Sequence, residues 1–200
     1  MSGAKIGRVL VASLHQAILE ELPTRLEFYE HWLNSDGLRD GTIGLAPMLA
    51  VLSFLRQEQT GYGPVVDRAG ALAAEWRLGE LSRLRLSSID RLPVPLRTRA
   101  GLGLARRLVR DGYSGTAGRV SLRRGQGRLT ISGSLFCDVR QPVARPLCGF
   151  YGAAVEYLLA RFEIPASVEI AACRATGALA CVVGVAVGAA QSGPDAESAA

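Results

Sequence analysis

The stretch VSLRRGQGRLTISGSL, residues 120–135, decides the fold class of this chain. Its apolar residues alternate with polar ones on both sides of the turn-like run 123–127, RRGQG, as in two half-buried strands joined by a hairpin. Before Gly112 the apolar residues instead recur at helical spacing. Helices first and antiparallel strands afterwards predict an α+β domain rather than a doubly wound parallel sheet.

The same patterns predict the order of elements along the chain. In the first half we expect helices over residues 10–22, 23–33, 46–58, 65–78 and 96–109. Residues 83–89 form either a short helix or an irregular crossing. A further helix is expected over 149–162, and closing strands over 168–172 and 180–187. We therefore expect one domain over 1–188, with a helical part over 1–112 and a strand-rich, cysteine-bearing part over 113–188, and a disordered tail over 189–200.

Composition excludes several classes of protein. The chain of 200 residues is 48% hydrophobic, yet no run of about 18 uncharged apolar residues occurs, so no transmembrane helix is expected. We find no signal peptide and expect the protein in the cytoplasm. The net charge is +5, but the densest basic cluster falls on one amphipathic helix without interleaved aromatic residues, so we expect no nucleic-acid binding. That cluster consists of Arg97, Arg99, Arg106, Arg107 and Arg110.

Four cysteines, all in the strand-rich half, are the main candidate site. Cys148 immediately precedes the late helix, and the turn-like segment 174–178 separates Cys173 from Cys181. A hairpin there and the start of the helix beside it would bring three or four thiols together. Four thiolates suit a tetrahedral soft metal ion such as zinc. Two alternatives stay open on spacing alone: buried cysteines that only fill the core, and a disulfide.

Other candidates for chemistry are weak. The only histidines, His15 and His31, lie on amphipathic helices and are expected at the surface. Neither a nucleophile elbow nor a dinucleotide-binding loop occurs. We therefore predict no catalytic residue, and whether the protein is an enzyme stays open.

Two segments resemble a known family. Residues 145–159, RPLCGFYGAAVEYLL, resemble the helix-start motif of the 4-vinyl reductase domain family. Residues 168–173, VEIAAC, with Gly177 and Cys181, resemble its closing signature. The similarity covers roughly residues 95–187, with the cysteines as its most specific part. It implies an α+β fold related to the small subunits of the TRAPP tethering complex, with an interior pocket for hydrophobic molecules.

The resemblance also implies a site. Relatives in that family hold zinc with three cysteines and a glutamate, and Cys148, Cys173 and Cys181 match the cysteines. Ile170 occupies the glutamate position, and Glu169, one residue out of register, would face the other side of a strand. Cys137 would then complete a four-cysteine structural zinc site. The expected pocket residues are Phe150 and Tyr151, which follow Cys148 on the helix.

Three functions follow from this resemblance. The first is a binding protein for a hydrophobic ligand, aromatic or tetrapyrrole-like. The second is an accessory or reductase-associated protein that acts at the 4-vinyl group in bacteriochlorophyll biosynthesis. The third is an assembly module similar to the TRAPP subunits, whose helical half forms the face of a homodimer.

Overall fold

The computed structural model describes residues 5–33, 44–58 and 60–188. The sequence also predicts a turn at residues 34–37, NSDG. This segment and the tail predicted at 189–200 lie outside the described residues. Within them the fold is α+β, as predicted: helices come first, and a four-stranded antiparallel sheet with a late helix follows.

The helices follow the apolar periodicity of the sequence, with two differences at prolines. The helix predicted from residue 65 begins earlier, at Tyr62, and Pro64 lies in its first turn, where a backbone N–H has no intrahelical partner to lose. The helix predicted from residue 96 likewise begins earlier, at Val94, with Pro95 in its first turn. Residues 83–89 are helical, and the Ser82 side chain accepts a hydrogen bond from the Arg85 N–H at 3.4 Å. The helices are α1 (Arg8–Glu21), α2 (Leu26–Leu33), α4 (Leu45–Gln57), α5 (Tyr62–Gly79), α6 (Arg83–Asp90), α7 (Val94–Gly112) and α8 (Gly149–Arg161).

The sheet contains the predicted hairpin. Its strands are β1 (Ala117–Arg123), β2 (Gln126–Ser132), β3 (Ala166–Ala172) and β4 (Cys181–Val187), in the spatial order β1-β2-β4-β3. Arg124 and Gly125 connect β1 to β2 with φ of 47° and 79°, which is the pair of positive angles that a two-residue hairpin turn of type I′ needs. The last strand, β4, therefore lies between β2 and β3 and pairs with both.

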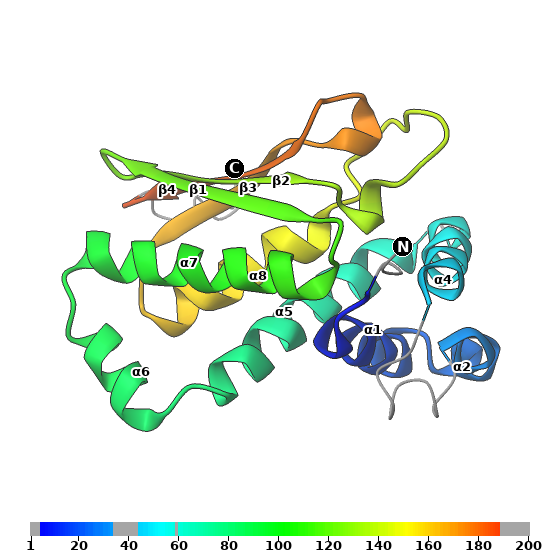
Figure 1. Cartoon of the computed structure of the whole chain (residues 1–200), viewed down its shortest axis with the longest axis horizontal. Helices are drawn as coiled ribbons and strands as arrows, with labels where there is room; N and C mark the ends of the chain where they lie inside the picture. Colours follow the sequence, from blue (N-terminus) through cyan, green and yellow to red (C-terminus); the bar gives the residue numbers. More distant parts are fainter. Residues whose placement is uncertain (1–4, 34–43, 59, 189–200) are drawn as a thin grey trace, which may run out of the picture.

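Two layers of helices lie on one face of the sheet (Figure 1). α7 and α8 run beneath the strands, and α5 packs on α8 from the other side. α5 and α8 are in close contact at Gly70: an ideal Cβ on this residue would lie only 2.1 Å from the carbonyl oxygen of Phe150. One hydrophobic core runs through both layers, from Leu14 and Leu52 in the helical half to Leu129 and Val183 in the sheet.

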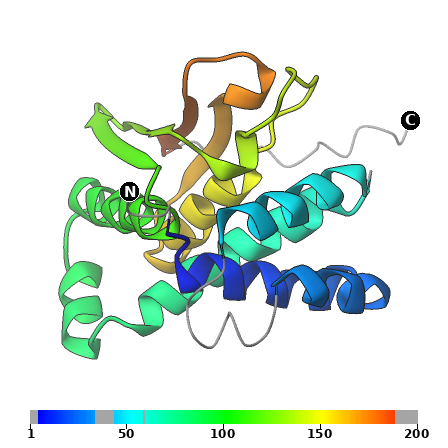
Figure 2. The same cartoon turned by 45° about the vertical axis from the view of Figure 1, so that its right-hand side comes forward.

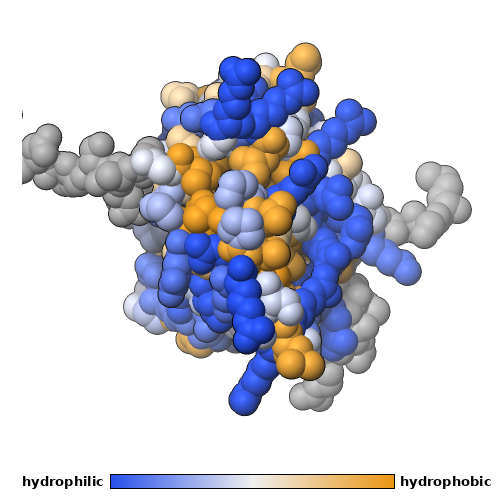
Figure 3. Space-filling view, turned by 90° about the vertical axis from the view of Figure 1, so that its left-hand side faces the viewer, coloured by the Kyte–Doolittle hydropathy of each residue, from blue (hydrophilic) through white to orange (hydrophobic). Residues whose placement is uncertain are grey.

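Hydrophilic side chains dominate the surface, and they border a smaller apolar area on the face shown in Figure 3. Three of the predicted basic residues on α7, namely Arg99, Arg106 and Arg110, are exposed, in agreement with a solvated helix face. Among the described residues, no helix is both long and apolar enough to span a bilayer.

Candidate metal centre

Three separate stretches of chain bring the four cysteines to one end of the sheet. Cys137 ends the short 3₁₀ helix η2 (Leu135–Cys137), and Cys148 caps the start of α8. Cys173 follows β3 and precedes the 3₁₀ turn η3 (Arg174–Thr176), and Cys181 is the first residue of β4. In both cartoon views the loops over 133–148 and 173–180 lie side by side (Figures 1 and 2). We call these four residues the cysteine cluster.

The geometry of the cysteine cluster suits a single metal ion. All four sulfur atoms lie within 4.8 Å of one another, and all four residues are buried. The Sγ atom of Cys137 is 3.4 Å from the Sγ atoms of both Cys173 and Cys181. A tetrahedron with metal–sulfur bonds of about 2.3 Å has sulfur–sulfur edges of about 3.8 Å, within the observed spread. An iron–sulfur cluster would need wider separations, because its cysteine ligands surround several iron atoms.

Backbone amides point at two of the sulfur atoms. The Leu147 N–H donates to Cys173 Sγ and the Arg174 N–H donates to Cys181 Sγ, each at 3.4 Å. Hydrogen bonds with Cys137 and Cys148, together with the Arg174 N–H, lower the pKa of Cys181 to about 4. Hydrogen bonds with Cys137 and Cys181, together with burial, raise the pKa of Cys148. Within the cysteine cluster, these interactions favour ionisation of the Cys181 thiol and disfavour ionisation of the Cys148 thiol.

Local backbone contacts fix the cysteine-bearing loops. Gly177 takes a φ of 98°, which few other residues adopt, and so lets the chain turn back toward Cys181. The Thr176 hydroxyl donates to the Cys173 carbonyl at 2.9 Å. The Val143 N–H donates to the Ala175 carbonyl at 2.7 Å, which ties the loop before Cys148 to η3. These bonds fix the backbone around Cys173 and tie it to the loop that precedes Cys148.

Two residues of the helical half reach the same loops. Arg56, in the last turn of α4, donates from Nη2 to the carbonyls of Leu135 and Phe136 at 3.4 and 3.1 Å. Tyr62, at the start of α5, donates from its hydroxyl to the Leu147 carbonyl at 2.7 Å. No sequence pattern singled out either residue, because their partners are backbone carbonyls about eighty positions away.

The two predicted pocket residues lie beside the cysteine cluster. Phe150 stacks on Phe136 with ring centroids 4.9 Å apart, and Tyr151 meets both rings edge-on. Phe150 also lines a cavity of about 370 Å³ between α1, α5 and α7, whereas the described lining of that cavity does not include Tyr151. Burial raises the pKa of Tyr151, which therefore stays protonated. A ligand-binding role for these two residues stays a prediction.

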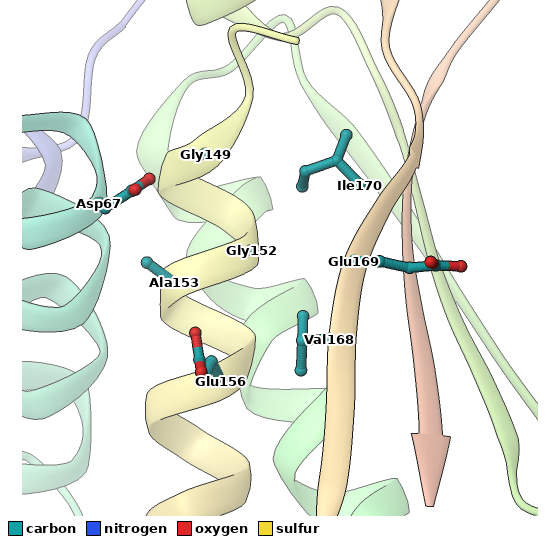
Figure 4. Close-up of a pocket in the computed structure, with 8 residues that line it drawn as sticks. All are labelled: Asp67, Gly149, Gly152, Ala153, Glu156, Val168, Glu169 and Ile170. Atoms are coloured by element: carbon teal, nitrogen blue, oxygen red, sulfur yellow. The ribbon is translucent and has the colours of Figure 1, made fainter. Parts of the chain in front are cut away.

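Neither Ile170 nor its neighbour contributes a carboxylate to the cysteine cluster. Figure 4 shows Val168 and Ile170 pointing from β3 toward α8, while Glu169 points away from it. These residues line a cavity of about 250 Å³ that also includes Asp67 and Glu156. Burial and the nearby Glu156 raise the pKa of Asp67.

Comparison with known proteins identifies the fold and no family. No family model matches the chain, and no curated protein matches it. Solved structures of H-NOX (haem nitric oxide/oxygen binding) proteins do match. A crystal structure from Shewanella oneidensis in the Fe(II)NO state has a TM-score of 0.56 at 12% identity, covering 91% of this chain and 99% of the other. An NMR structure in the Fe(II)CO state has a TM-score of 0.53 at 13% identity, covering 94% and 98%.

These comparisons correct several predictions. The resemblance to the 4-vinyl reductase domain family and the TRAPP subunits was wrong, since the matching solved structures are H-NOX proteins. The three functions derived from it, including the role in bacteriochlorophyll biosynthesis, fall with it. Zinc as the cofactor is not supported either, because those structures are described in iron ligation states. The motif of residues 145–159 was misleading because a short apolar helix start occurs in many folds.

The residues present do not fit haem. Haem iron needs an axial His, Cys, Met or Tyr facing a cavity. None of the described cavities, of about 250, 370 and 840 Å³, is lined by any of these residue types. His15 lies on α1 with Nε2 3.0 Å from Glu30 Oε1, His31 is exposed on α2, and Met48 is buried in the core. The four thiols contact one another, and no His, Cys, Met or Tyr lines any of the three described cavities.

Proposed function

We propose that the protein is a metal-responsive domain that binds one soft transition-metal ion at Cys137, Cys148, Cys173 and Cys181. The observation that carries the proposal is the convergence of four buried sulfur atoms within 4.8 Å of one another. The proposal concerns the donor set, which favours a soft ion in tetrahedral geometry.

The arrangement also explains what binding would change. A bound ion would link η2, the start of α8 and both ends of the β3–β4 connection. Binding replaces thiol protons with metal bonds, so it releases protons and becomes tighter as the pH rises. Because the ion binds only the folded arrangement, loading stabilises the domain, by about 2.7 kcal/mol at a free ion concentration of 100 times Kd. The response of the protein to the metal would be this increase in stability, together with tighter ordering of the linked segments.

Cobalt(II) titration of the reduced protein under anaerobic conditions tests the proposal. Tetrahedral cobalt–thiolate centres give intense visible bands together with sulfur-to-metal charge transfer, and we expect saturation at one ion per chain. Cys173→Ser and Cys181→Ser should weaken or abolish these bands. Thr98→Ser, an equally small change at a buried residue on α7, is the matched control and should leave them intact. Absence of charge-transfer bands in the folded wild-type protein would overturn the proposal.

Haem-dependent gas sensing is not proposed, because a shared fold does not establish a shared function and no His, Cys, Met or Tyr lines any of the three described cavities. No contact among the described residues argues for the predicted homodimer or for the predicted tetrapyrrole ligand, and both stay predictions. The cytoplasmic location also stays a prediction. Light scattering of the purified protein measures the oligomeric state directly.

A further inference from the structure

Arg56 connects α4 to the segment that carries Cys137. Its Nη2 donates to two consecutive carbonyls, those of Leu135 and Phe136. Both carbonyls belong to η2, which ends at Cys137, so the guanidinium holds the backbone just before this thiol. Arg56 is half-buried, and Nη2 carries two N–H groups, so this one atom can donate to both carbonyls at once.

Tyr62 connects α5 to the segment that carries Cys148. Its hydroxyl donates to the Leu147 carbonyl at 2.7 Å, while the Leu147 N–H donates to Cys173 Sγ. Leu147, the residue before Cys148, is thus held through both of its backbone polar groups. Its carbonyl is bound by the helical half and its N–H by another member of the cysteine cluster. Burial raises the pKa of Tyr62, so the phenol remains a donor.

We infer that Arg56 and Tyr62 are positioning residues that preorganise the cysteine cluster and couple its loading to the α4–α5 region. This inference rests on the proposed metal binding. Without these bonds the loops before Cys137 and Cys148 would sample other positions in the unloaded protein. Binding would then have to order them, and the affinity would fall by that cost.

The coupling works in both directions. If contacts from α4 and α5 raise the affinity for metal, loading must strengthen the same contacts by an equal factor. Amide exchange in α4 and in the first turn of α5 should therefore slow when the wild-type protein is loaded. A purely structural role of Arg56 would leave this exchange independent of metal.

The test compares Tyr62→Phe and Arg56→Met with matched controls. Tyr62→Phe removes only the hydroxyl, and Tyr157→Phe removes the hydroxyl of a half-buried tyrosine on α8 that lies outside the described contacts of the cysteine cluster. Arg56→Met keeps most of the stem without donors, and Arg25→Met removes an arginine whose partner is Glu58. We expect cobalt(II) affinity about tenfold weaker in each test variant, equivalent to about 1.4 kcal/mol, and unchanged in both controls. Arg56→Lys should recover part of the loss.

A second measurement keeps this inference separate from the metal proposal. In the unloaded protein, the thiols of Tyr62→Phe and Arg56→Met should react with Ellman's reagent several times faster than wild type, while the controls match wild type. If wild type binds no cobalt(II), the proposed function falls, and the thiol rates alone decide whether the two residues position the cysteines. Wild-type thiol rates and wild-type affinity in both test variants would overturn the inference.

Discussion

Replacing Gly70 with alanine tests the packing that places the start of α8. An ideal Cβ on Gly70 would lie 2.1 Å from the carbonyl oxygen of Phe150 and 2.9 Å from its carbonyl carbon. Because the obstacle is backbone, no rotamer change relieves it, and α5 and α8 must separate by about 1 Å to restore an ordinary contact. Phe150 lies in the first turn of α8, two residues after Cys148, so this separation also shifts a member of the cysteine cluster.

Two opposing terms give the size of the effect. Overpacking a well-packed core costs about 1–3 kcal/mol, while alanine in place of glycine inside a helix gains up to about 1 kcal/mol. We expect Gly70→Ala to lower the free energy of unfolding by about 1–2 kcal/mol, or the melting temperature by about 2–8 °C. Urea denaturation followed by circular dichroism measures it. The matched control is Gly103→Ala in α7, whose added Cβ meets nothing within 4 Å and should stabilise the protein. A Gly70→Ala protein as stable as Gly103→Ala would refute the packing argument.

Three further outcomes are expected. Burial and the nearby Glu156 raise the pKa of Asp67, so its carboxyl group binds a proton more tightly in the folded chain than in the unfolded chain. Ionisation of Asp67 therefore costs stability as the pH rises through the raised pKa. We expect Asp67→Asn to unfold at a higher urea concentration than wild type at pH 7, and to lose this advantage at a pH of about 3.5. Gly133→Ala should destabilise the protein by about 1 kcal/mol or more, because Gly133 has a φ of 72° and its Cβ would meet the Gly115 carbonyl oxygen at 2.1 Å; equal urea midpoints would contradict this. Purified protein incubated with haem and passed through a desalting column should show no Soret band, and a stoichiometric Soret band would contradict the misfit described above.

The sequence allowed the fold class to be predicted because its signals are local. Alternation around Gly125 indicated the hairpin, and periodic apolar residues indicated the helices. Convergence of the cysteines was also foreseeable, since the segment 174–178 is short enough to return the chain and Gly177 permits the turn. The hydrogen bonds of Arg56 and Tyr62 to the cysteine-bearing loops could not be predicted, because a side chain that donates to a distant backbone carbonyl leaves no pattern in the sequence. The family assignment failed because a short motif was given more weight than it carries, whereas the resemblance in fold extends over nine-tenths of the chain.

The position of β4 has a consequence for the order in which the protein matures. Cys181 is the first residue of this strand and lies opposite Ile131 of β2, so its thiol reaches the others only when the last strand inserts between β2 and β3. Such long-range pairing is slow to form, because the entropy of closing the loop must be lost first. During synthesis, three thiols therefore emerge before the fourth, and a nascent chain can complete its ligand set only after Cys181 has emerged. Capture of the ion would then report that the sheet has closed.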